Sequence, residues 1–366
     1  MTVITILGAG VMGTALGFPA SDNGHEVRLV GTDHDAEIIE ACQKGRLHPR
    51  LHRALPAGVT PFFNGDLPTA MAGAEIVVVG VSSRGVHWAA EQLSPYIRPG
   101  HILLMVTKGM ESTADGRLQL LPDVLRERLP AAVRDQVHYA CIGGPSIAGE
   151  LAGRRPTAVV FASREASILP RLQAIFSTPY YHIWTSTDLV GVEVCVAMKN
   201  PYALAVGLAA GVLERVEKYT PDAAGAGMHN YGAAVFAQGL AETAQLVQAL
   251  GGGLETVFSL PGAGDLYVTT QGGRNARMGR LLGLGLPYSE AVEEMPNETV
   301  EGVDAVLAMM PAIEAMTQRG ELPPDALPLL RELHRIVTRS TAIDFDFEAF
   351  FSRLSLTPPK RQRMES

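Results

Sequence analysis

The stretch VITILGAGVMGTALGF, residues 3–18, decides the fold of the N-terminal half of this 366-residue chain. Its first five residues are a short, largely β-branched apolar run, which is typical of a buried strand. The glycine-rich turn GAGVMG, residues 8–13, follows directly, and a segment with helical spacing continues to Gly24. A strand, a G-x-G-x-x-G turn and a helix in this order predict a dinucleotide-binding unit.

Each glycine of this turn has its own physical task. Gly8 permits the tight turn, Gly10 lets the backbone approach a pyrophosphate, and Gly13 allows the helix to pack closely on the strand. The helix presents its first amides, those of Val11 and Met12, and the positive end of its dipole to the anion. A glycine turn without a ligand is the alternative, but the alternating strands and helices that follow favour a bound dinucleotide.

The type of dinucleotide depends on the end of the second strand. An acidic residue about 20 positions after the glycines binds the ribose 2′-hydroxyl in NAD enzymes, and Asp33 lies at about that distance. Asp33 follows the strand by three residues, so it can also point to solvent, and Thr32 can bind either a ribose or a phosphate. No Lys or Arg stands beside Thr32, which favours NAD and leaves NADP open.

The rest of the N-terminal half alternates between apolar runs and helix-like segments. This alternation predicts right-handed crossovers and a doubly wound parallel sheet, the α/β architecture of the Rossmann fold. The predicted strands are Glu26–Val30, Glu75–Val81, Ile102–Val106, His138–Ile142 and Thr157–Phe161, and the predicted helices include Ala36–Gln43 and Leu118–Leu129.

From about Thr187 the pattern changes to long helical segments, which predicts an all-α C-terminal domain. The predicted helices are Val190–Glu217, Met228–Leu250, Asn275–Leu284, Tyr288–Glu294 and Val300–Thr317. We therefore expect a dinucleotide-binding domain over residues 1–188, a helical substrate and catalytic domain over 189–350, and a frayed tail over 351–366.

The composition excludes several classes of protein. The chain is 47% hydrophobic and its formal net charge is −8, which argues against nucleic acid or an anionic membrane as the main partner. No segment reaches the ~18 to 20 unbroken apolar residues of a membrane span, and no export signal precedes the first strand. The cysteines Cys42, Cys141 and Cys195 form no disulfide or metal motif, so we expect no metal and a cytoplasmic location.

A charged residue inside an apolar helix is the first candidate for chemistry. Lys199 and Asn200 lie in the run VCVAMKNPYA, where an amine is costly unless it is paired or functional. Burial lowers the pKa of a lysine toward neutrality, which suits a general acid/base that moves the hydroxyl proton during hydride transfer. A lysine that snorkels from a helix end is the alternative.

Two further segments supply polar groups. In PGAGDLYVTTQGGRNARMG, Asp265 lies in a glycine-rich turn, and Arg274 and Asn275 begin a predicted helix, where a guanidinium and backbone amides can bind an anion. Lys108, in VTKGME, follows a strand at the sheet edge where open α/β sheets bind ligands. The alternatives are a helix cap for Asp265, a surface position for Arg274 and a solvated loop for Lys108.

Six motifs then occur together in the order and approximate spacing of one enzyme family. They are GAGVMGTAL, TKGME, GGPSIAGELAGRRPTAVV, AMKNPYALAVGLAAG, PGAGDL and GGRNARMG. Over roughly residues 1–320 the chain resembles the NAD(P)-dependent glycerol-3-phosphate dehydrogenases. The resemblance implies a Rossmann domain followed by a helical domain, a homodimer, and reversible reduction of dihydroxyacetone phosphate to sn-glycerol 3-phosphate in phospholipid precursor supply.

The resemblance also implies a role for each motif residue. The general acid/base would be Lys199, and the groups that assist it at the reacting oxygen would be Lys108 and Asp265. The phosphate end would be held by Thr269, Arg274 and Asn275. The substrate pocket would also be lined by Gly144, Ser146, Asn200 and Lys108. The cofactor would be approached by Ala148, Glu301, Lys108 and Arg274.

The chain departs from the common bacterial pattern at three places. The segment LERVEKYTPDAAGAGMHNYG, residues 213–232, leaves Asn230 as the counterpart of a family motif, Gln238 stands where a basic residue is common, and the loop 80–83 lacks a common proline. These differences are typical of a divergent, archaeal-type branch. They leave open a related sugar- or cyclitol-phosphate dehydrogenase, or a β-hydroxyacid dehydrogenase of the same superfamily. A non-catalytic dinucleotide sensor would not need the whole polar set.

Overall fold

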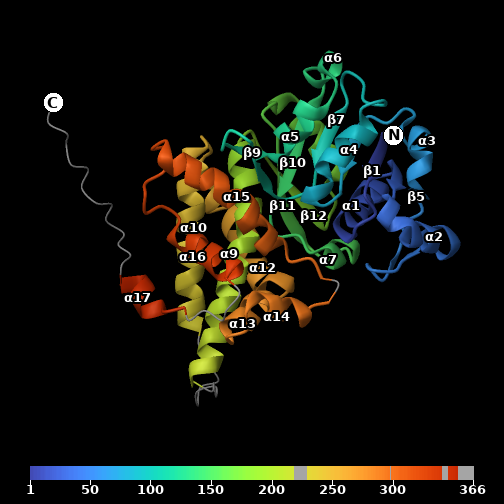
Figure 1. Cartoon of the computed structure of the whole chain (residues 1–366). Coiled ribbons are helices and arrows are strands. Elements are labelled where there is room, and N and C mark those ends of the chain that lie inside the picture. The colour runs from blue at the N-terminus through green and yellow to red at the C-terminus, as the bar shows by residue number, and fades with distance from the viewer. Residues whose placement is uncertain (218–228, 297, 340–344, 353–366) are drawn as a thin grey trace, which may run out of the picture.

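The computed structural model describes residues 1–217, 229–296, 298–339 and 345–352. Figure 1 shows two parts, a sheet with helices on both faces, coloured blue to green, and a group of helices, coloured yellow-green to red. Most of the predicted tail, residues 353–366, and the centre of the divergent segment, residues 218–228, lie outside the described residues.

One eight-stranded sheet forms the N-terminal part, in the order β12-β11-β10-β7-β6-β1-β2-β5. The strands from β5 to β10 pair in parallel, and the order reverses at β1, which pairs with both β2 and β6. This is the doubly wound arrangement that the sequence predicts. The strands are β1 (Val3–Leu7), β2 (Glu26–Val30), β5 (Val59–Phe62), β6 (Ile76–Val79), β7 (Ile102–Met105), β10 (His138–Gly143), β11 (Thr157–Ala162) and β12 (Tyr181–Ser186).

The outer end of the sheet departs from the parallel arrangement. β11 pairs antiparallel with β10, and β12 runs parallel to β11. A parallel strand would need a crossover along a face of the sheet. The segment 144–156 instead contains the short helix α7 (Ala148–Ala152), which packs against α1 (Val11–Asp22), and it returns to the edge from which it started.

The predicted helix over Leu118–Leu129 is wrong at its start. β9 (Leu118–Leu120) pairs with β8 (Met110–Ser112) in a small hairpin, and α5 (Leu121–Arg128) begins only after it. Pro122 lies in the first turn of α5, where its missing N–H costs nothing, so the helix starts there and leaves Leu120 extended.

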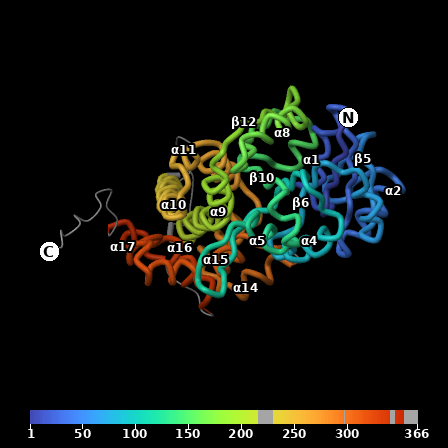
Figure 2. Tube along the Cα trace, turned by 90° about the horizontal axis from the view of Figure 1, so that it is seen from above, coloured from blue at the N-terminus to red at the C-terminus, as the bar shows by residue number. Residues whose placement is uncertain are grey.

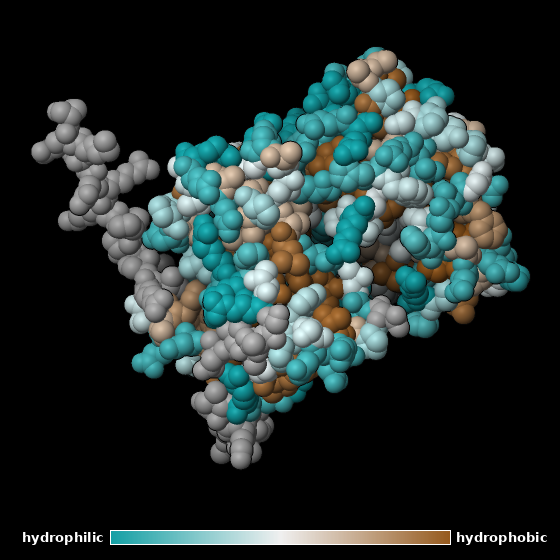
Figure 3. All heavy atoms as spheres, in the orientation of Figure 1, coloured by the Kyte–Doolittle hydropathy of each residue, from teal (hydrophilic) through white to brown (hydrophobic). Residues whose placement is uncertain are grey.

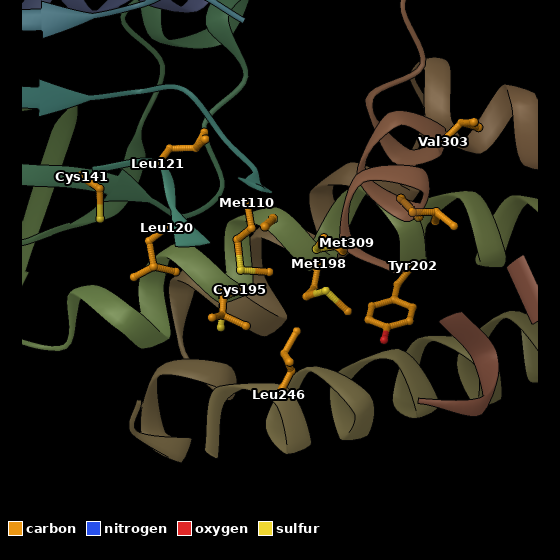
Figure 4. Packing of buried hydrophobic residues seen from close by; sticks show 14 of the residues in the cluster. Met110, Leu120, Leu121, Cys141, Cys195, Met198, Tyr202, Leu246, Val303 and Met309 are labelled. Atoms are coloured by element: carbon orange, nitrogen blue, oxygen red, sulfur yellow. The ribbon is translucent and has the colours of Figure 1, made fainter. Parts of the chain in front are cut away.

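Alternating side chains divide the sheet between two cores. Ile4 and Ile6 of β1 pack against α1 and α8 (Leu169–Phe176) on one face. Val77 and Val79 of β6 face the other side and belong to a core that continues into the helical part. Figure 4 shows this junction, where side chains from the sheet and the β8–β9 hairpin meet those of the helix α9 (Leu189–Glu217). The two parts of the chain therefore share one hydrophobic core.

The helical part is built around α9, which Figures 1 and 2 place between the sheet and α10. α9 over Leu189–Arg215 is long and apolar enough to cross a membrane, but 89% of its most apolar window is buried inside the protein. The five predicted helices are confirmed, but the described residues also contain helices over 254–257, 265–270, 328–338 and 347–352 that were not predicted. The helices that follow α9 are α10 (His229–Ala249), α11 (Leu254–Val257), α12 (Asp265–Thr270), α13 (Arg274–Gly283), α14 (Tyr288–Glu293), α15 (Glu301–Gln318), α16 (Pro328–Thr338) and α17 (Phe347–Ser352).

Glycines on facing sides bring α9 and α13 into backbone contact. A Cβ added to Gly207 would lie 2.2 Å from the carbonyl oxygen of Ala276, and one added to Gly279 would lie 1.9 Å from that of Leu204. These distances are far below van der Waals contact, so only glycine fits at either position. The close approach places the N-terminal end of α13 beside the middle of α9.

We expect Gly279→Ala to destabilise the protein by about 1–3 kcal/mol, because the added methyl must push two helix backbones apart. Gly45→Ala is the matched control, since Gly45 ends α2 (Ala36–Gly45) and a Cβ there meets no atom within 4 Å. Alanine should stabilise that position by roughly 0.5–1 kcal/mol. Urea unfolding measures both, and equal effects of the two variants would contradict the close helix contact.

Candidate active site

The glycine-rich turn has the geometry of a dinucleotide cradle. Gly8 has φ of 108°, and a Cβ there would lie 2.7 Å from the carbonyl group of Gly80 at the end of β6. A Cβ on Gly13 would lie 2.9 Å from the carbonyl oxygen of Gly8. A Cβ on Gly10 would meet no atom of the described residues closer than 3.7 Å, and none of their side chains caps the start of α1. The turn is thus closely packed at Gly8 and Gly13 and open at Gly10, which fits a pyrophosphate.

The two acidic residues of the loop after β2 lie in different environments. Asp33 is exposed, and its carboxylate accepts a hydrogen bond from Asn64 at 3.0 Å. Asp35 is buried and accepts hydrogen bonds from the backbone and hydroxyl of Thr32, at 2.9 and 2.8 Å. Asp35 also accepts from the backbone N–H of Ala9, at 3.2 Å. Sequence reasoning missed Asp35, whose role depends on this contact with a distant turn.

Three charged side chains from separate segments meet beneath the sheet edge. Asp265 begins α12 and is 1% exposed, and Lys199 of α9 donates a hydrogen bond to its Oδ1. Lys108, in the loop after β7, approaches Oδ2 of the same carboxylate at 3.3 Å. The hydroxyl of the adjacent Thr107 fixes this loop by donating to the carbonyl oxygens of Val79 and Val81.

One carboxylate between two amines sets the proton affinity of both lysines. Burial lowers the pKa of Lys199 to about 7; the Asp265 carboxylate opposes this shift, and the charge of Lys108 adds to it. Burial also disfavours the charged form of Lys108, but the carboxylates of Asp265 and Glu301 outweigh burial and raise its pKa. At neutral pH, Lys108 therefore stays charged while Lys199 can exchange a proton.

A network of amides lies next to the charged cluster. Asn275 of α13 donates to the side-chain oxygen of Asn200 at 2.9 Å and accepts from the backbone N–H of Gly302 at 2.8 Å. Asn200 in turn donates to Glu301 at 2.9 Å. Arg274 approaches Glu301 at 3.4 Å, and its side chain is 48% exposed. The helices α9, α13 and α15 are thereby joined at one point.

The GGPS segment lies against the turn that carries Asp265. Gly144 has φ of 129°, and Pro145 lies 3.4 Å from the position of a Cβ on Gly264. The Oγ atom of Ser146 is buried and has no hydrogen-bond partner among the residues that the structure describes. A buried hydroxyl without a partner is costly unless a ligand satisfies it, so Ser146 fits a substrate pocket.

The remaining predicted site residues differ in their contacts and in their exposure. The hydroxyl of Thr269 donates to the carbonyl oxygen of Asp265 inside α12, at 2.6 Å. Ala148 begins α7, next to Ile147, whose side chain is 47% exposed. Val11, in the first turn of α1, is 38% exposed. Figure 3 shows hydrophobic surface at the junction of the two parts of the chain, as expected for a ligand site with apolar walls.

Comparisons with known proteins identify the family. The models of the N-terminal and C-terminal parts of NAD-dependent glycerol-3-phosphate dehydrogenase match residues 3–169 and 188–345. The chain belongs to this family. An NADP(+)-dependent glycerol-3-phosphate dehydrogenase from Archaeoglobus fulgidus is 35% identical over 93% of this chain and 97% of that protein. A glycerol-3-phosphate dehydrogenase [NAD(P)+] from Bacillus velezensis is 31% identical over 97% of this chain and 95% of that protein.

The solved structures agree with this assignment. The crystal structure of glycerol-3-phosphate dehydrogenase from Coxiella burnetii is 28% identical, with a TM-score of 0.77 over 93% of this chain and 95% of that chain. The expected Rossmann and helical domains are thus confirmed. Membership in the glycerol-3-phosphate dehydrogenase family also confirms the predicted NAD(P)-dependent enzyme, with NAD or NADP as its cofactor.

We expect Asn275→Ala to lower the free energy of unfolding by about 1–3 kcal/mol, because it leaves the buried Asn200 oxygen and the Gly302 N–H without partners. Arg274→Ala, at the neighbouring half-exposed position, should change stability by less than about 0.5 kcal/mol. Chemical denaturation compares the two variants. A larger loss in Arg274→Ala than in Asn275→Ala would contradict the network described.

Proposed function

We propose that the enzyme reversibly reduces dihydroxyacetone phosphate to sn-glycerol 3-phosphate, with Lys199 as the general acid/base. The observation that carries the proposal is the buried Lys199–Asp265 pair beside Lys108, in a member of the glycerol-3-phosphate dehydrogenase family. In this proposal the cofactor binds to residues 1–188, and residues 189–350 supply Lys199, Asp265 and the phosphate-binding groups.

The chemistry that the dinucleotide supplies when bound is the transfer of hydride to or from the substrate carbon. Lys199 donates a proton to the substrate oxygen during reduction and removes it during oxidation. Asp265 holds the Lys199 ammonium in place through its Oδ1. Lys108 remains charged and stabilises negative charge that develops on the reacting oxygen. Solvent is kept from the pair because Asp265 and Lys199 are 1% and 9% exposed.

The substrate phosphate binds in this proposal at the start of α13. No side chain of the described residues caps this helix, whose N-cap residue is Gly273. Its first amides can therefore bind an anion together with the half-exposed guanidinium of Arg274. Asn275 supports the site from behind, because its side chain is already bonded to Asn200 and Gly302. Ser146, whose buried hydroxyl has no partner among the described residues, provides a further hydrogen-bond donor to the substrate in this proposal.

The direct test is oxidation of NADH and NADPH by the purified protein with dihydroxyacetone phosphate. Dihydroxyacetone, which lacks the phosphate, is the control substrate. Rapid oxidation that requires the phosphate supports the proposal, and the two rates show which dinucleotide is preferred. Binding of NADH or NADPH without oxidation would instead favour a related sugar-phosphate or hydroxyacid substrate.

The pH dependence should report the pKa of Lys199, which lies at about 7. Reduction requires the protonated amine, so kcat/KM for dihydroxyacetone phosphate should fall as pH rises through about 7, whereas kcat/KM for the oxidation of sn-glycerol 3-phosphate should rise over the same range. Lys199→Ala and Lys199→Arg should each lower turnover by roughly 10²- to 10⁴-fold, because arginine keeps the charge but cannot release its proton. Both variants should still bind NADH or NADPH. Near-normal turnover in either variant would refute the acid/base role.

Arg274→Ala should raise KM for dihydroxyacetone phosphate roughly 10- to 100-fold, because a charge-assisted bond to the phosphate is lost. Arg277→Ala is the matched control, since Arg277 lies on the same helix and pairs with Glu298 at 2.9 Å. The difference between the variants should vanish with dihydroxyacetone. Equal KM values for the phosphorylated substrate would remove Arg274 from the phosphate site.

Two further expectations, a cytoplasmic location and a homodimer, belong to the same proposal. The three cysteines are free and buried, which fits an enzyme of the reducing cytoplasm. The homodimer stays a prediction, which sedimentation of the purified protein would check.

A further inference from the structure

The residue at the centre of the cofactor turn is held through both of its peptide groups. Ala9 lies between Gly8 and Gly10, and its N–H donates to the Asp35 carboxylate at 3.2 Å. Its carbonyl oxygen lies 2.9 Å from Nε2 of His48. The His48 residue is fully buried and Asp35 is 8% exposed. Neither residue belongs to the glycine motif, and each reaches it from a different segment of the chain.

The second nitrogen of His48 defines its tautomer. The backbone N–H of Leu51 donates to Nδ1 of His48 at 3.0 Å, so Nδ1 carries no proton. Nε2 must then carry the proton and donate it to the Ala9 carbonyl oxygen. Burial lowers the pKa of His48, and the nearby Arg50 lowers it further, while the bond to Ala9 and the charge of Asp35 oppose the shift. The neutral ring is therefore the form that fits this place.

A small hairpin, residues 46–55, delivers His48 to the turn. β3 (Leu47–His48) pairs antiparallel with β4 (Arg53–Ala54). Arg46 closes the hairpin, because its guanidinium donates to the carbonyl oxygens of Leu55 and Val59, each at 3.1 Å. The hairpin follows α2 and precedes β5, so it lies beside the glycine turn without being part of the strand–turn–helix motif.

We infer that His48 is a positioning residue for the dinucleotide: it fixes the Ala9–Gly10 peptide group through the Ala9 carbonyl, while Asp35 fixes the Gly8–Ala9 peptide group through the Ala9 N–H. Gly8 and Gly10, on either side of Ala9, allow this turn more backbone conformations than other residue types would at these positions. Rotation of the Ala9–Gly10 peptide group would turn the N–H of Gly10, at the open side of the cradle, and with it the first amides of α1. The hydrogen bonds of His48 and Asp35 hold these groups in place before the dinucleotide arrives, which lowers the entropic cost of binding. The inference rests on NAD(P) use alone and not on the identity of the substrate.

Two substitutions separate the two bonds of His48. Gln places an amide near the position of Nε2 and can still donate to the Ala9 carbonyl, whereas Asn places an oxygen near Nδ1 and can only accept from Leu51. We expect His48→Asn to raise the dissociation constant of NADH or NADPH about three- to ten-fold, the effect of one buried hydrogen bond. His48→Gln should stay within about two-fold of the wild-type value. The same change at the exposed His52 of this hairpin, His52→Asn, should leave the constant unchanged.

The measurement is direct titration of the full-length protein with NADH and with NADPH, without any triose phosphate. It therefore stands whatever substrate the enzyme uses. Dihydroxyacetone phosphate KM at saturating dinucleotide should be unchanged in all three variants, and the melting temperatures report folding separately. Wild-type affinity in His48→Asn would overturn the inference, and so would weaker binding in His48→Gln than in His48→Asn. A parallel rise in the substrate KM would also overturn it, because that would indicate a general structural role.

Discussion

The Asp265 carboxylate is the group on which the site depends, because it pairs with the amines of both the buried Lys199 and the partly buried Lys108. A buried amine without a partner would be neutral or would destabilise the fold. Lys108 comes from the loop after β7 and Lys199 from α9, so one carboxylate joins the sheet to the helical part. The same arrangement shifts the pKa values of the two lysines in opposite directions, because one carboxylate cannot fully compensate two positive charges. The burial of Lys199 is thus a consequence of how the two parts pack.

That packing relies on small residues where helices cross. Gly207 and Gly279 let α9 and α13 touch through their backbones. A Cβ on Gly302, at the start of α15, would lie 2.6 Å from the carbonyl oxygen of Asn200. With no side chains to separate these helices, a single residue such as Asn275 can bond to both neighbours of α13. The polar network is short because the backbones are close.

In the glycine turn at residues 8–13, backbone groups are instead held by side chains from outside the motif. The glycine turn supplies space and amides, but its glycines provide no side chains that could fix it. Asp35 and His48 fix the turn instead, through hydrogen bonds to the N–H and the carbonyl oxygen of Ala9. Both are buried, and within the described residues their hydrogen bonds go to the turn, to Thr32 and to Leu51 rather than to Lys108, Lys199 or Asp265.

The sequence by itself determined the features that depend on local spacing. The turn at residues 8–13, the change to helices after residue 187 and the motifs around Lys108, Lys199 and Asp265 could be predicted, because each is written in a continuous segment. The tertiary structure alone decided the direction of β11, the hairpin before α5 and the partners of each polar group. Lys108 and Asp265 are 157 positions apart, and His48 is 39 from Ala9. Periodicity and composition describe neighbours along the chain, whereas burial and hydrogen bonding depend on segments that meet only when the chain has folded.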